Sequence, residues 1–332
     1  MSDISLSVAL SRNTMTEPIL SGRVKAQGIR WATSAVHPSE MFWRQLKFQD
    51  FDISEMSLSS MTIAASQGTR DWVALPVFTS RRFFHTGIVV RDGAGIESPA
   101  DLVGKRVGVP EYQQTAAVWT RAALQHEFGV VPEQMTWLME RPPSKSHGGS
   151  TAFSPPPGVK LSYISTDTNI GEMLGRAELD AAAVYIADNN LIDRTRASAA
   201  DISGVRTLFA DPVAEGARYY QSTGLLPVNH VVVIRKNLLE QEPWIALNVY
   251  AAFLEAKQVA RAPVKELLEP WLQIGTVPQV VSAALDTVDP LPYGLRDQPE
   301  VFQALSTYLQ EQGLTSEKFP IEDLFAKATL DM

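Results

Sequence analysis

The stretch RQLKFQDFDISEM, residues 44–56, has the pattern of a helix end, a tight turn through aspartate and a following strand. A second stretch, EMLGRAELDAAAV at residues 172–184, repeats the pattern 128 residues later. When the two are aligned without gaps, Asp52 of the first matches Asp180 of the second. Short helix–turn–strand units also resemble one another by chance. Even so, the same device used twice favours a protein with two similar lobes.

Strand-like and helix-like runs alternate over the middle of the chain. KRVGVP, residues 105–110, is typical of a strand, and QTAAVWTRAALQHEFG, residues 114–129, follows it with the pattern of a helix that ends at a glycine. KLSYIS, residues 160–165, and DAAAVYIA, residues 180–187, are strand-like runs on either side of another helical run. This alternation predicts an α/β protein with mostly parallel sheets.

The chain returns to its first lobe near its end. HVVVIRKN, residues 230–237, has the pattern of a strand, and the remainder of the chain is mostly helical. We therefore expect lobe one to consist of residues 1–90 and 226–332, and lobe two to consist of residues 91–225. Two lobes joined by two crossings would form a hinged cleft of the kind that holds small ligands.

Composition limits the classes of function. The chain has 332 residues and a formal net charge of −8, which disfavours nucleic acid and anionic membranes as partners. It has no cysteine, which excludes disulfides, thiol catalysis and cysteine-ligated metals. No apolar run reaches the ~18 residues of a membrane span, and the N-terminus alternates like a strand from Ile4 to Leu10 without the basic region of a signal peptide. We therefore expect a cytoplasmic protein, with its oligomeric state open and a homo-oligomer among the options.

The sequence has no cofactor signature. The histidines are few and do not form the close pairs of common zinc sites. The five are His37, His85, His126, His147 and His230. The GxSxG elbow, the P-loop and the GxGxxG motif are also missing. The sequence thus predicts neither a metal nor an organic cofactor.

Three expected helix starts carry polar side chains suited to an anion. Helix N-termini offer free N–H groups and a positive partial charge, so they hold carboxylates and phosphates well. Ordinary N-capping explains any one of these starts equally well, but three of them after strands favour an anion-binding cleft. The residues are Ser57, Ser59 and Ser60 in the first, Gln113, Gln114 and Thr115 in the second, and Asp167 and Thr168 in the third.

Basic residues cluster in the stretch PVFTSRRFFHTGIVV, residues 76–90. The rest of the stretch has the pattern of a buried strand, and burying an unpaired positive charge costs on the order of several kcal/mol. If the strand continues through the cluster, Arg81 and His85 lie on one face and Arg82 on the other. An arginine is a bidentate anchor for a carboxylate, and a histidine can transfer a proton near neutral pH. The alternative is a surface arginine pair beside a histidine at the edge of the core.

Five segments, spread over residues 51–295, match a known pattern. They are FDISEMSLSS, PVFTSRRFFHTGI, SPADLVGKRVGVPEYQQTAAVW, RYYQSTGLLPVNHVVVIRKN and DPLPYGL. They resemble the 4,5-dihydroxyphthalate decarboxylase family, and GVPEYQQTA and PVFTSR with the histidine after it are the more specific matches. The resemblance implies a two-lobed type II periplasmic-binding-protein-like fold with two hinge crossings. It also implies a cofactor-independent decarboxylase of a hydroxylated aromatic acid.

The resemblance also implies roles for the residues. A substrate such as 4,5-dihydroxyphthalate needs an anchor for the carboxylate that stays and a proton for the ring carbon that loses CO₂. Arg81 or the arginine after it, with the first two helix starts, is the expected anchor. His85 and His230 are the candidates for proton donor and phenol base, in either order. Tyr112 and Tyr293 are candidates to line the ring, although Tyr293 and His230 have packing roles as alternatives.

Two other functions fit the same fold. Most proteins of this fold bind solutes, so a cytoplasmic or trimmed periplasmic binding protein for a small aromatic or carboxylated ligand is the main alternative. The missing signal peptide and the absence of a cysteine for lipid attachment count against it. A third option is another enzyme of the fold, such as a pyrimidine-precursor synthase, but no cysteine-rich or histidine-rich signature favours it.

Overall fold

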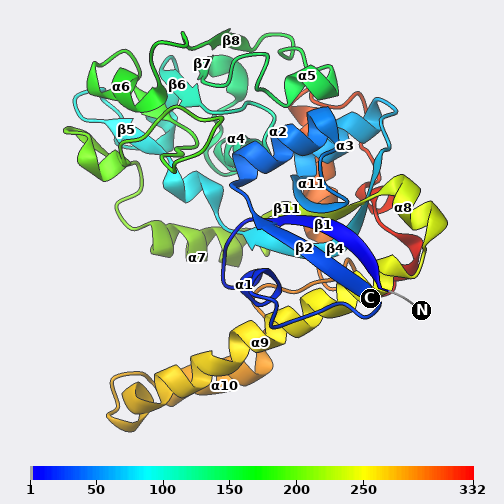
Figure 1. Cartoon of the computed structure of the whole chain (residues 1–332). Coiled ribbons are helices and arrows are strands. Elements are labelled where there is room, and N and C mark those ends of the chain that lie inside the picture. Colours follow the sequence, from blue (N-terminus) through cyan, green and yellow to red (C-terminus); the bar gives the residue numbers. More distant parts are fainter. Residues whose placement is uncertain (1–2) are drawn as a thin grey trace.

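Two separate sheets organise the molecule (Figure 1). The computed structural model describes residues 3–332, except for the side chain of residue 265. Residues 4–81 and 228–235 supply the strands of the first sheet, and the residues between these two ranges form the second. A long helical arm extends from the part of the molecule that holds the first sheet.

The first sheet has five strands. In spatial order they are β2 (Ile29–Ala35), β1 (Ile4–Leu10), β3 (Ile53–Ser57), β11 (Val228–Arg235) and β4 (Trp72–Arg81). Strand β1 is parallel to both of its neighbours, and β11 is antiparallel to both of its own. The middle of β11 is buried on both faces, which explains its continuous run of apolar residues. This is the return strand that the sequence predicts.

The second sheet has six short strands. In spatial order they are β10 (Val205–Thr207), β5 (Val89–Arg91), β9 (Ala181–Ala182), β6 (Arg106–Val109), β7 (Thr136–Met139) and β8 (Lys160–Tyr163). Strands β6 to β9 are mutually parallel, and β5 is antiparallel to β9 and β10. Because β3 and β9 lie in different sheets, the predicted two-lobed α/β fold class is confirmed. The lobe boundaries at 1–90, 91–225 and 226–332 stay a prediction.

Helices surround both sheets (Figure 1). The α-helices are α1 (Glu17–Leu20), α2 (Pro38–Phe48), α3 (Leu58–Ser66), α4 (Thr115–Phe128), α5 (Gly148–Thr151), α6 (Ile170–Gly175), α7 (Pro212–Thr223), α8 (Lys236–Gln241), α9 (Ile245–Gln273), α10 (Gln279–Thr287) and α11 (Pro299–Glu311). The 3₁₀ turns are η1 (Phe84–Gly87), η2 (Pro99–Leu102), η3 (Pro132–Gln134), η4 (Ala199–Asp201), η5 (Ile321–Leu324) and η6 (Lys327–Thr329).

The chain passes between the two sheets twice, from β4 through η1 to β5 and from β10 through α7 to β11. The strand does not continue through RRFFH, because β4 ends at Arg81 and the backbone then coils into η1, so the assignment of faces that depended on a continuous strand does not apply. The rings of Phe83 and His85 both pack on Tyr219 of the other crossing, at centroid distances of 5.9 and 4.8 Å.

The sequence repeat of the two lobes is also a structural repeat. Gln49 and Ala177, which align with each other, both adopt the left-handed conformation, with φ of 54° and 58°. The aspartate that follows each turn accepts a hydrogen bond from a backbone N–H of the neighbouring parallel strand. Asp52 accepts from Ser7 at 2.8 Å, and Asp180 accepts from the first residue of β6 at 3.0 Å. The same turn therefore starts one strand in each sheet.

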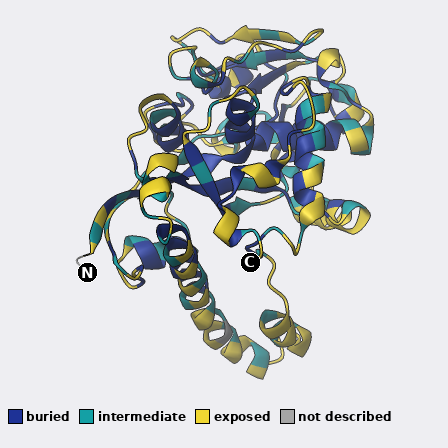
Figure 2. Ribbon diagram, turned by 90° about the vertical axis from the view of Figure 1, so that its right-hand side faces the viewer, coloured by how far each residue is buried: buried dark blue, intermediate teal, exposed yellow. Residues whose placement is uncertain are grey.

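The C-terminal part of the chain completes the first lobe. The first half of α9 packs against β4 and α1. Further along, Phe325 forms a parallel bridge with Ala74 at the edge strand β4, and its ring packs against Phe78. Figure 2 shows that buried residues fill the body, whereas the far half of α9 and α10 are largely exposed.

Ala177 gives a test of the repeated turn. A side chain in the left-handed conformation costs free energy that glycine does not incur. We expect Ala177→Gly to raise the free energy of unfolding by about 0.5–1 kcal/mol, measured by urea unfolding. The matched control is Ala217→Gly on the exposed face of α7, which should lower it by a similar amount. Equal destabilisation by both changes would contradict this account of the turn.

Candidate active site

A cavity of about 300 Å³ lies between the two lobes. The first lobe contributes the carboxyl ends of β1, β3 and β4 and the start of β11, and the second lobe contributes the start of α4 and the chain after β7 and β9. In open α/β sheets, ligands bind at this edge. The lining residues are Ser11, Asn13, His37, Pro38, Ser39, Phe42, Ser57, Thr79, Ser80, Arg82, Phe84, Gln114, Ala116, Arg141, Val184, Ile186, Asp188, Asn229 and His230.

Arg82 supplies the positive charge of the cavity that has no carboxylate partner among the described residues. The lining also holds Arg141, His37 and His230 against the one described carboxylate of Asp188. Arg141 and His230 are each paired with a buried carboxylate behind the lining. An anionic ligand in the cavity would therefore meet the charge of Arg82.

A buried carboxylate holds His230 in place. Its Nδ1 lies 3.0 Å from Oε2 of Glu55, and the ring of Phe42 packs edge-on against it at 4.8 Å. Glu55 also accepts hydrogen bonds from Oγ1 of Thr79 and from N and Oγ of Ser11, each at 2.7 Å. Because Nδ1 is occupied, Nε2 is the ring nitrogen that can meet a ligand in the cavity.

Glu55 is fully buried but remains ionised. Burial by itself raises the pKa of a carboxyl group, but the hydrogen bonds from His230, Ser11 and Thr79 outweigh it and hold the pKa of Glu55 below its usual value. An ionised carboxylate at Nδ1 fixes the tautomer and the orientation of the histidine, as the buried aspartate does in a serine-protease triad. The pair is therefore arranged for proton transfer at Nε2.

Two hydrogen-bond donors at the cavity have no partner among the described residues. Arg82 is exposed and forms no hydrogen bond or ion pair there, and its guanidinium lies over the ring of Phe84 at 5.2 Å. Nε2 of Gln114 is buried and unpaired. Gln114 is also the N-cap residue of α4, and Ala116 in the first turn lines the cavity, so the positive end of the helix dipole lies here. These groups can hold a carboxylate.

Arg141, in contrast, is already neutralised. Its Nε and Nη2 donate to the carboxylate of Asp193 at 2.7 and 3.1 Å, and Nη2 also donates to Oγ of Ser39 in α2 at 2.7 Å. Its Nη1 lies 3.3 Å from Nε2 of His147. Burial, with the charge of Arg141, holds the pKa of His147 well below its usual value. This network joins α2 to the chain after β7 and forms one wall of the cavity.

His37 is a hydrogen-bond donor at the cavity. As the N-cap residue of α2, it accepts a hydrogen bond at Nδ1 from N of Ser39 at 3.2 Å, and its Nε2 lies 3.7 Å from Oδ2 of Asp188. Burial lowers the pKa of His37. The positive charge of Arg141 also lowers this pKa, whereas the charges of Asp193 and Asp188 raise it by less. The neutral ring therefore carries its hydrogen at Nε2.

The first two helix starts lie against each other and are hydrogen-bonded to one another. Oγ of Ser57 lies 2.9 Å from Oγ1 of Thr115, and Oγ of Ser59 donates to the carbonyl of Gln113 at 2.6 Å. Oγ1 of Thr115 also accepts from N of Ser59 at 3.0 Å. Most of the groups expected to hold an anion instead hold the two lobes together.

The structure brings few of the predicted helix-start residues to the cavity. Only Ser57 and Gln114 of these residues line it. Ser60 is turned away, and its Oγ lies 2.9 Å from Nδ1 of His147. The third helix, α6, is capped by Asn169, one residue after the pair expected from the sequence.

Arg81 and Tyr293 lie outside the cavity lining. The guanidinium of Arg81 donates to Oε1 of Gln298 and, at 2.9 Å, to the carbonyl of Pro292. Burial lowers the pKa of Arg81 to about 10, so it stays protonated at neutral pH. Tyr293 is buried nearby. These residues fasten the C-terminal segment to β4, and Arg82 is the arginine that reaches the cavity.

His85 and Tyr112 are also absent from the cavity lining. Nε2 of His85 lies 3.1 Å from Oε1 of Glu215, and its ring packs on Tyr219. Burial lowers the pKa of His85, although Glu215 acts in the opposite direction. The ring of Tyr112 lies under the guanidinium of Arg121 at 3.8 Å. Both predicted site residues therefore have packing partners of their own.

Sequence reasoning missed Glu55, Arg141 and His37 as site residues. A signal for Glu55 is present, because a carboxylate within the buried strand ISEMS needs a partner. Arg141 opens a segment rich in proline, glycine and serine, where no periodicity shows which side chains are buried. His37 precedes a proline at a helix start, a pattern that looks like ordinary capping.

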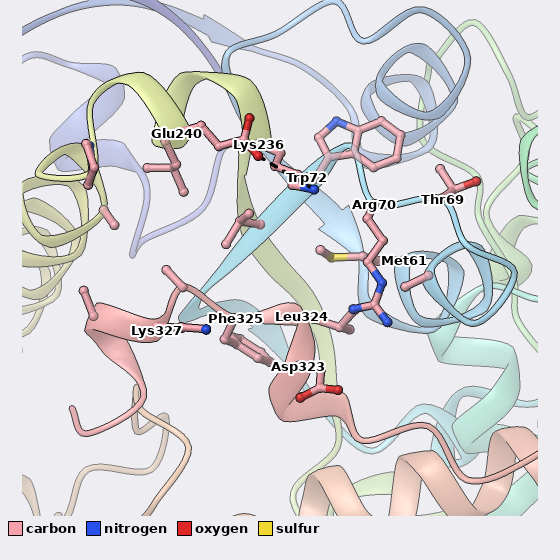
Figure 3. Close-up of a pocket in the computed structure, with 17 residues that line it drawn as sticks. Met61, Thr69, Arg70, Trp72, Lys236, Glu240, Asp323, Leu324, Phe325 and Lys327 are labelled. Atoms are coloured by element: carbon pink, nitrogen blue, oxygen red, sulfur yellow. Dashed lines mark ion pairs between the residues drawn. The ribbon is translucent and has the colours of Figure 1, made fainter.

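A larger hollow, of about 580 Å³, lies between α3, α8 and the C-terminal turns η5 and η6. Figure 3 shows Trp72, Leu324 and Phe325 around it, with an ion pair between Lys236 and Glu240 at 3.8 Å. Its described lining has no histidine. A mainly apolar hollow whose described lining offers no histidine for proton transfer near neutral pH is a poorer candidate than the cavity between the lobes.

No helix of residues 3–332 is long and apolar enough to cross a membrane. Within the same range, no three histidine, aspartate or glutamate side chains gather as they would around a metal ion.

The sequence is similar to curated proteins over its whole length. It is 32% identical to the 4,5-dihydroxyphthalate decarboxylase of Comamonas testosteroni, and the alignment covers 100% of this chain and 99% of that protein. The chain belongs to the 4,5-dihydroxyphthalate decarboxylase family. The family model described as NMT1/THI5 like matches residues 54–140, which in this decarboxylase-family chain run from β3 past the end of β7.

Solved structures confirm the fold of this member of the decarboxylase family. The alkanesulfonate-binding protein SsuA from Xanthomonas axonopodis pv. citri, bound to MOPS, aligns with a TM-score of 0.57 at 14% identity, over 98% of this chain and 99% of that one. The desulfurization enzyme DSZB aligns with a TM-score of 0.52 at 14% identity, and the alignment covers 98% of this chain and 97% of that one. The predicted type II periplasmic-binding-protein-like fold is confirmed, and it serves both binding and catalysis.

Glu55 should make stability depend on pH. Its folded-state pKa is depressed, so its ionised form stabilises the fold above the unfolded-state pKa of about 4.3, and this contribution is lost as the pH falls through the folded-state value. We expect Glu55→Gln to be less stable than the parent by about 2–4 kcal/mol at pH 7, with a smaller difference at pH 3. Urea unfolding at both pH values measures it.

The control for this measurement is Glu317→Gln, at an exposed position, which should leave the free energy of unfolding unchanged at both pH values. If Glu55→Gln lowers the free energy of unfolding by the same amount at pH 7 and at pH 3, the charge of Glu55 is not what stabilises this edge of the sheet.

Proposed function

We propose that this protein catalyses the cofactor-independent decarboxylation of a hydroxylated aromatic dicarboxylic acid, with 4,5-dihydroxyphthalate as the first candidate. One observation carries the proposal: two unpaired donors, Arg82 and Gln114, share a cavity with a histidine held by a buried glutamate. The name of the full-length relative supports the choice of substrate. The cytoplasmic location expected from the sequence stays a prediction.

The cavity offers a place for each part of such a substrate. Arg82, Gln114 and the N-terminus of α4 would hold the carboxylate that stays on the ring. Phe42 and Phe84 are the aromatic side chains of the wall and suit contact with a benzene ring. His37, with its hydrogen at Nε2, would donate to a ring oxygen and stabilise its phenolate form.

The reaction consumes one proton and releases CO₂. In 4,5-dihydroxyphthalate each carboxylate is para to a ring hydroxyl, whose phenolate form raises the electron density on the carbon that bears the carboxylate. The imidazolium form of His230 would donate its Nε2 proton to this carbon. The bond to the carboxylate then breaks, its electron pair returns to the ring, and CO₂ and 3,4-dihydroxybenzoate are formed. Glu55 would hold the histidine in place, and solvent would return the proton.

A binding protein for a small carboxylated ligand is the alternative, because SsuA bound to MOPS has the same fold. Unpaired donors alone would suffice for binding. A histidine fixed by an ionised, fully buried glutamate adds a proton-transfer group that binding does not need. This pair therefore favours the enzyme.

His230 is the residue whose replacement tests the mechanism. We expect His230→Ala to lower kcat by roughly 10²–10⁴-fold while substrate binding persists. The assay is CO₂ release, or the ultraviolet change as 4,5-dihydroxyphthalate becomes 3,4-dihydroxybenzoate, with binding followed by calorimetry. The matched control is His126→Ala, because His126 lies on the surface beside Glu311 and away from the cavity.

Two outcomes would count against this function. Tight binding without turnover by the parent protein, across a panel of hydroxylated phthalates, would favour a binding protein. Full activity of His230→Ala would leave decarboxylation standing but remove His230 as proton donor. A loss of activity in His85→Ala with the fold intact would restore the sequence-based choice of His85.

Arg82 is the residue whose replacement tests the anchor. Loss of a charge-assisted hydrogen bond of about 1.5–3 kcal/mol should lower kcat/KM by about 10- to 100-fold, mainly through KM if the carboxylate is held equally in ground and transition states. Steady-state kinetics of Arg82→Ala measure it. Arg176→Ala, at an exposed arginine of the second lobe, is the control and should match the parent. An unchanged KM in Arg82→Ala would place the anchor elsewhere.

A further inference from the structure

A helical hairpin projects from the body of the molecule. It consists of the second half of α9, a short turn and α10, and it ends before residue 289. Figures 1 and 2 both show it extending away from the two sheets. No described side chain of residues 262–288 is buried. We call this segment the arm.

One apolar stripe runs along the whole of α9. In the first half of the helix it is buried in the body, where Phe253, Ala256 and Ala260 follow one another at spacings of three or four residues. The spacing continues into the arm with Leu267 and Trp271, followed by Ile274 at the end of the helix. These positions lie on the same face of a helix. The stripe that packs against β4 and α1 in the body therefore continues into the arm, where neither element reaches it.

The stripe is uncovered in the arm. Leu267 is 70% exposed, Trp271 53% and Ile274 72%. Soluble proteins seldom leave neighbouring large apolar side chains this open unless another surface covers them. The charged residues of this part of α9, Glu266 and Glu269 among them, lie off the stripe, so a partner could cover it without burying a charge.

The hairpin is itself loosely filled. A hollow of about 330 Å³ lies between α10 and the base of the arm, lined by apolar residues such as Val281, Leu285 and Val288. Hollows of about 410 and 480 Å³ also flank the two helices. Leu267, Trp271 and Ile274 line none of these three hollows, so α10 leaves the stripe uncovered.

We propose that the arm is a dimerisation element, and that its partner is the arm of a second copy of this chain. The two arms would pack about a two-fold axis, with the stripes of their α9 helices in antiparallel contact near Trp271. A self-complementary stripe is what a two-fold interface needs, because the same surface serves both copies. The proposal is independent of the decarboxylase activity.

Size and charge favour a second copy over a membrane. The arm has 27 residues, from 262 to 288, and a standard interface uses roughly 20–30 residues from each side. Residues 262–288 contain one lysine against Glu266, Glu269 and Asp286, so the arm is acidic, as is the whole chain. An anionic lipid surface would repel the arm as a whole, whereas a second stripe would meet only the uncharged face, because the acidic residues of α9 lie off the stripe.

The molecular mass in solution tests the proposal. Light scattering after size exclusion should give the full chain, of 36.5 kDa, about twice that mass or a multiple of it. The double variant Leu267→Glu/Trp271→Glu should elute at the monomer mass with its circular dichroism unchanged. The control is Val213→Glu, because Val213 is 82% exposed on α7, outside the arm, and its variant should keep the mass of the parent.

A single introduced cysteine tests the antiparallel geometry, because the chain has no cysteine of its own. Trp271→Cys, near the proposed axis, should form a disulfide-linked dimer under mild oxidation, and Val213→Cys should not. A parent protein that is monomeric at tens of micromolar overturns the proposal, as does an oligomer that persists in the Leu267→Glu/Trp271→Glu variant. Binding of the monomer to anionic vesicles through the arm would overturn it in favour of a lipid surface.

Discussion

One buried carboxylate organises the edge of the first sheet where the cavity opens. Glu55 in β3 accepts hydrogen bonds from Ser11 after β1, from Thr79 in β4 and from His230 in β11. Without such partners a buried charge would cost roughly several kcal/mol. The ends of β1, β3 and β4 and the start of β11 are therefore held together around this carboxylate. The bonds that hold the sheet edge are therefore the same bonds that aim the histidine into the cavity, and stability and chemistry rest on one group.

Local patterns were sufficient to predict the lobes but not the orientation of side chains at the site. The turn pattern at residues 44–56 and 172–184, and the apolar run of β11, depend on neighbouring residues only. Which of Arg81 and Arg82 reaches the cavity, in contrast, does not depend on neighbouring residues only. The register of β4 against β11 shifts on both sides of His230, which breaks the alternation of faces before β4 ends. The chain then coils into η1, and Arg82 reaches the cavity.

The partners that make the site are also far apart in sequence. Glu55 and His230 are separated by 175 positions in the sequence. Arg141 and Ser39, whose side chains are hydrogen-bonded, are separated by 102. A single sequence shows that a buried charge needs a partner, but not which residue supplies it. His85 illustrates the same limit, because a histidine beside two arginines suggested a catalytic group, whereas Glu215 of the other crossing binds it 130 positions away.

The two adjacent arginines differ because their surroundings differ. Arg81 is half-buried, and its guanidinium donates hydrogen bonds to the carbonyl of Pro292 and to the side chain of Gln298. The segment that brings Pro292 there is held from its other side by Lys257 of α9, which binds Asp289 at the base of the arm. A positive charge in a buried stretch therefore need not indicate a ligand, since backbone carbonyls can satisfy it. The arginine that lacks such partners is the one available to an anion, and here that is Arg82.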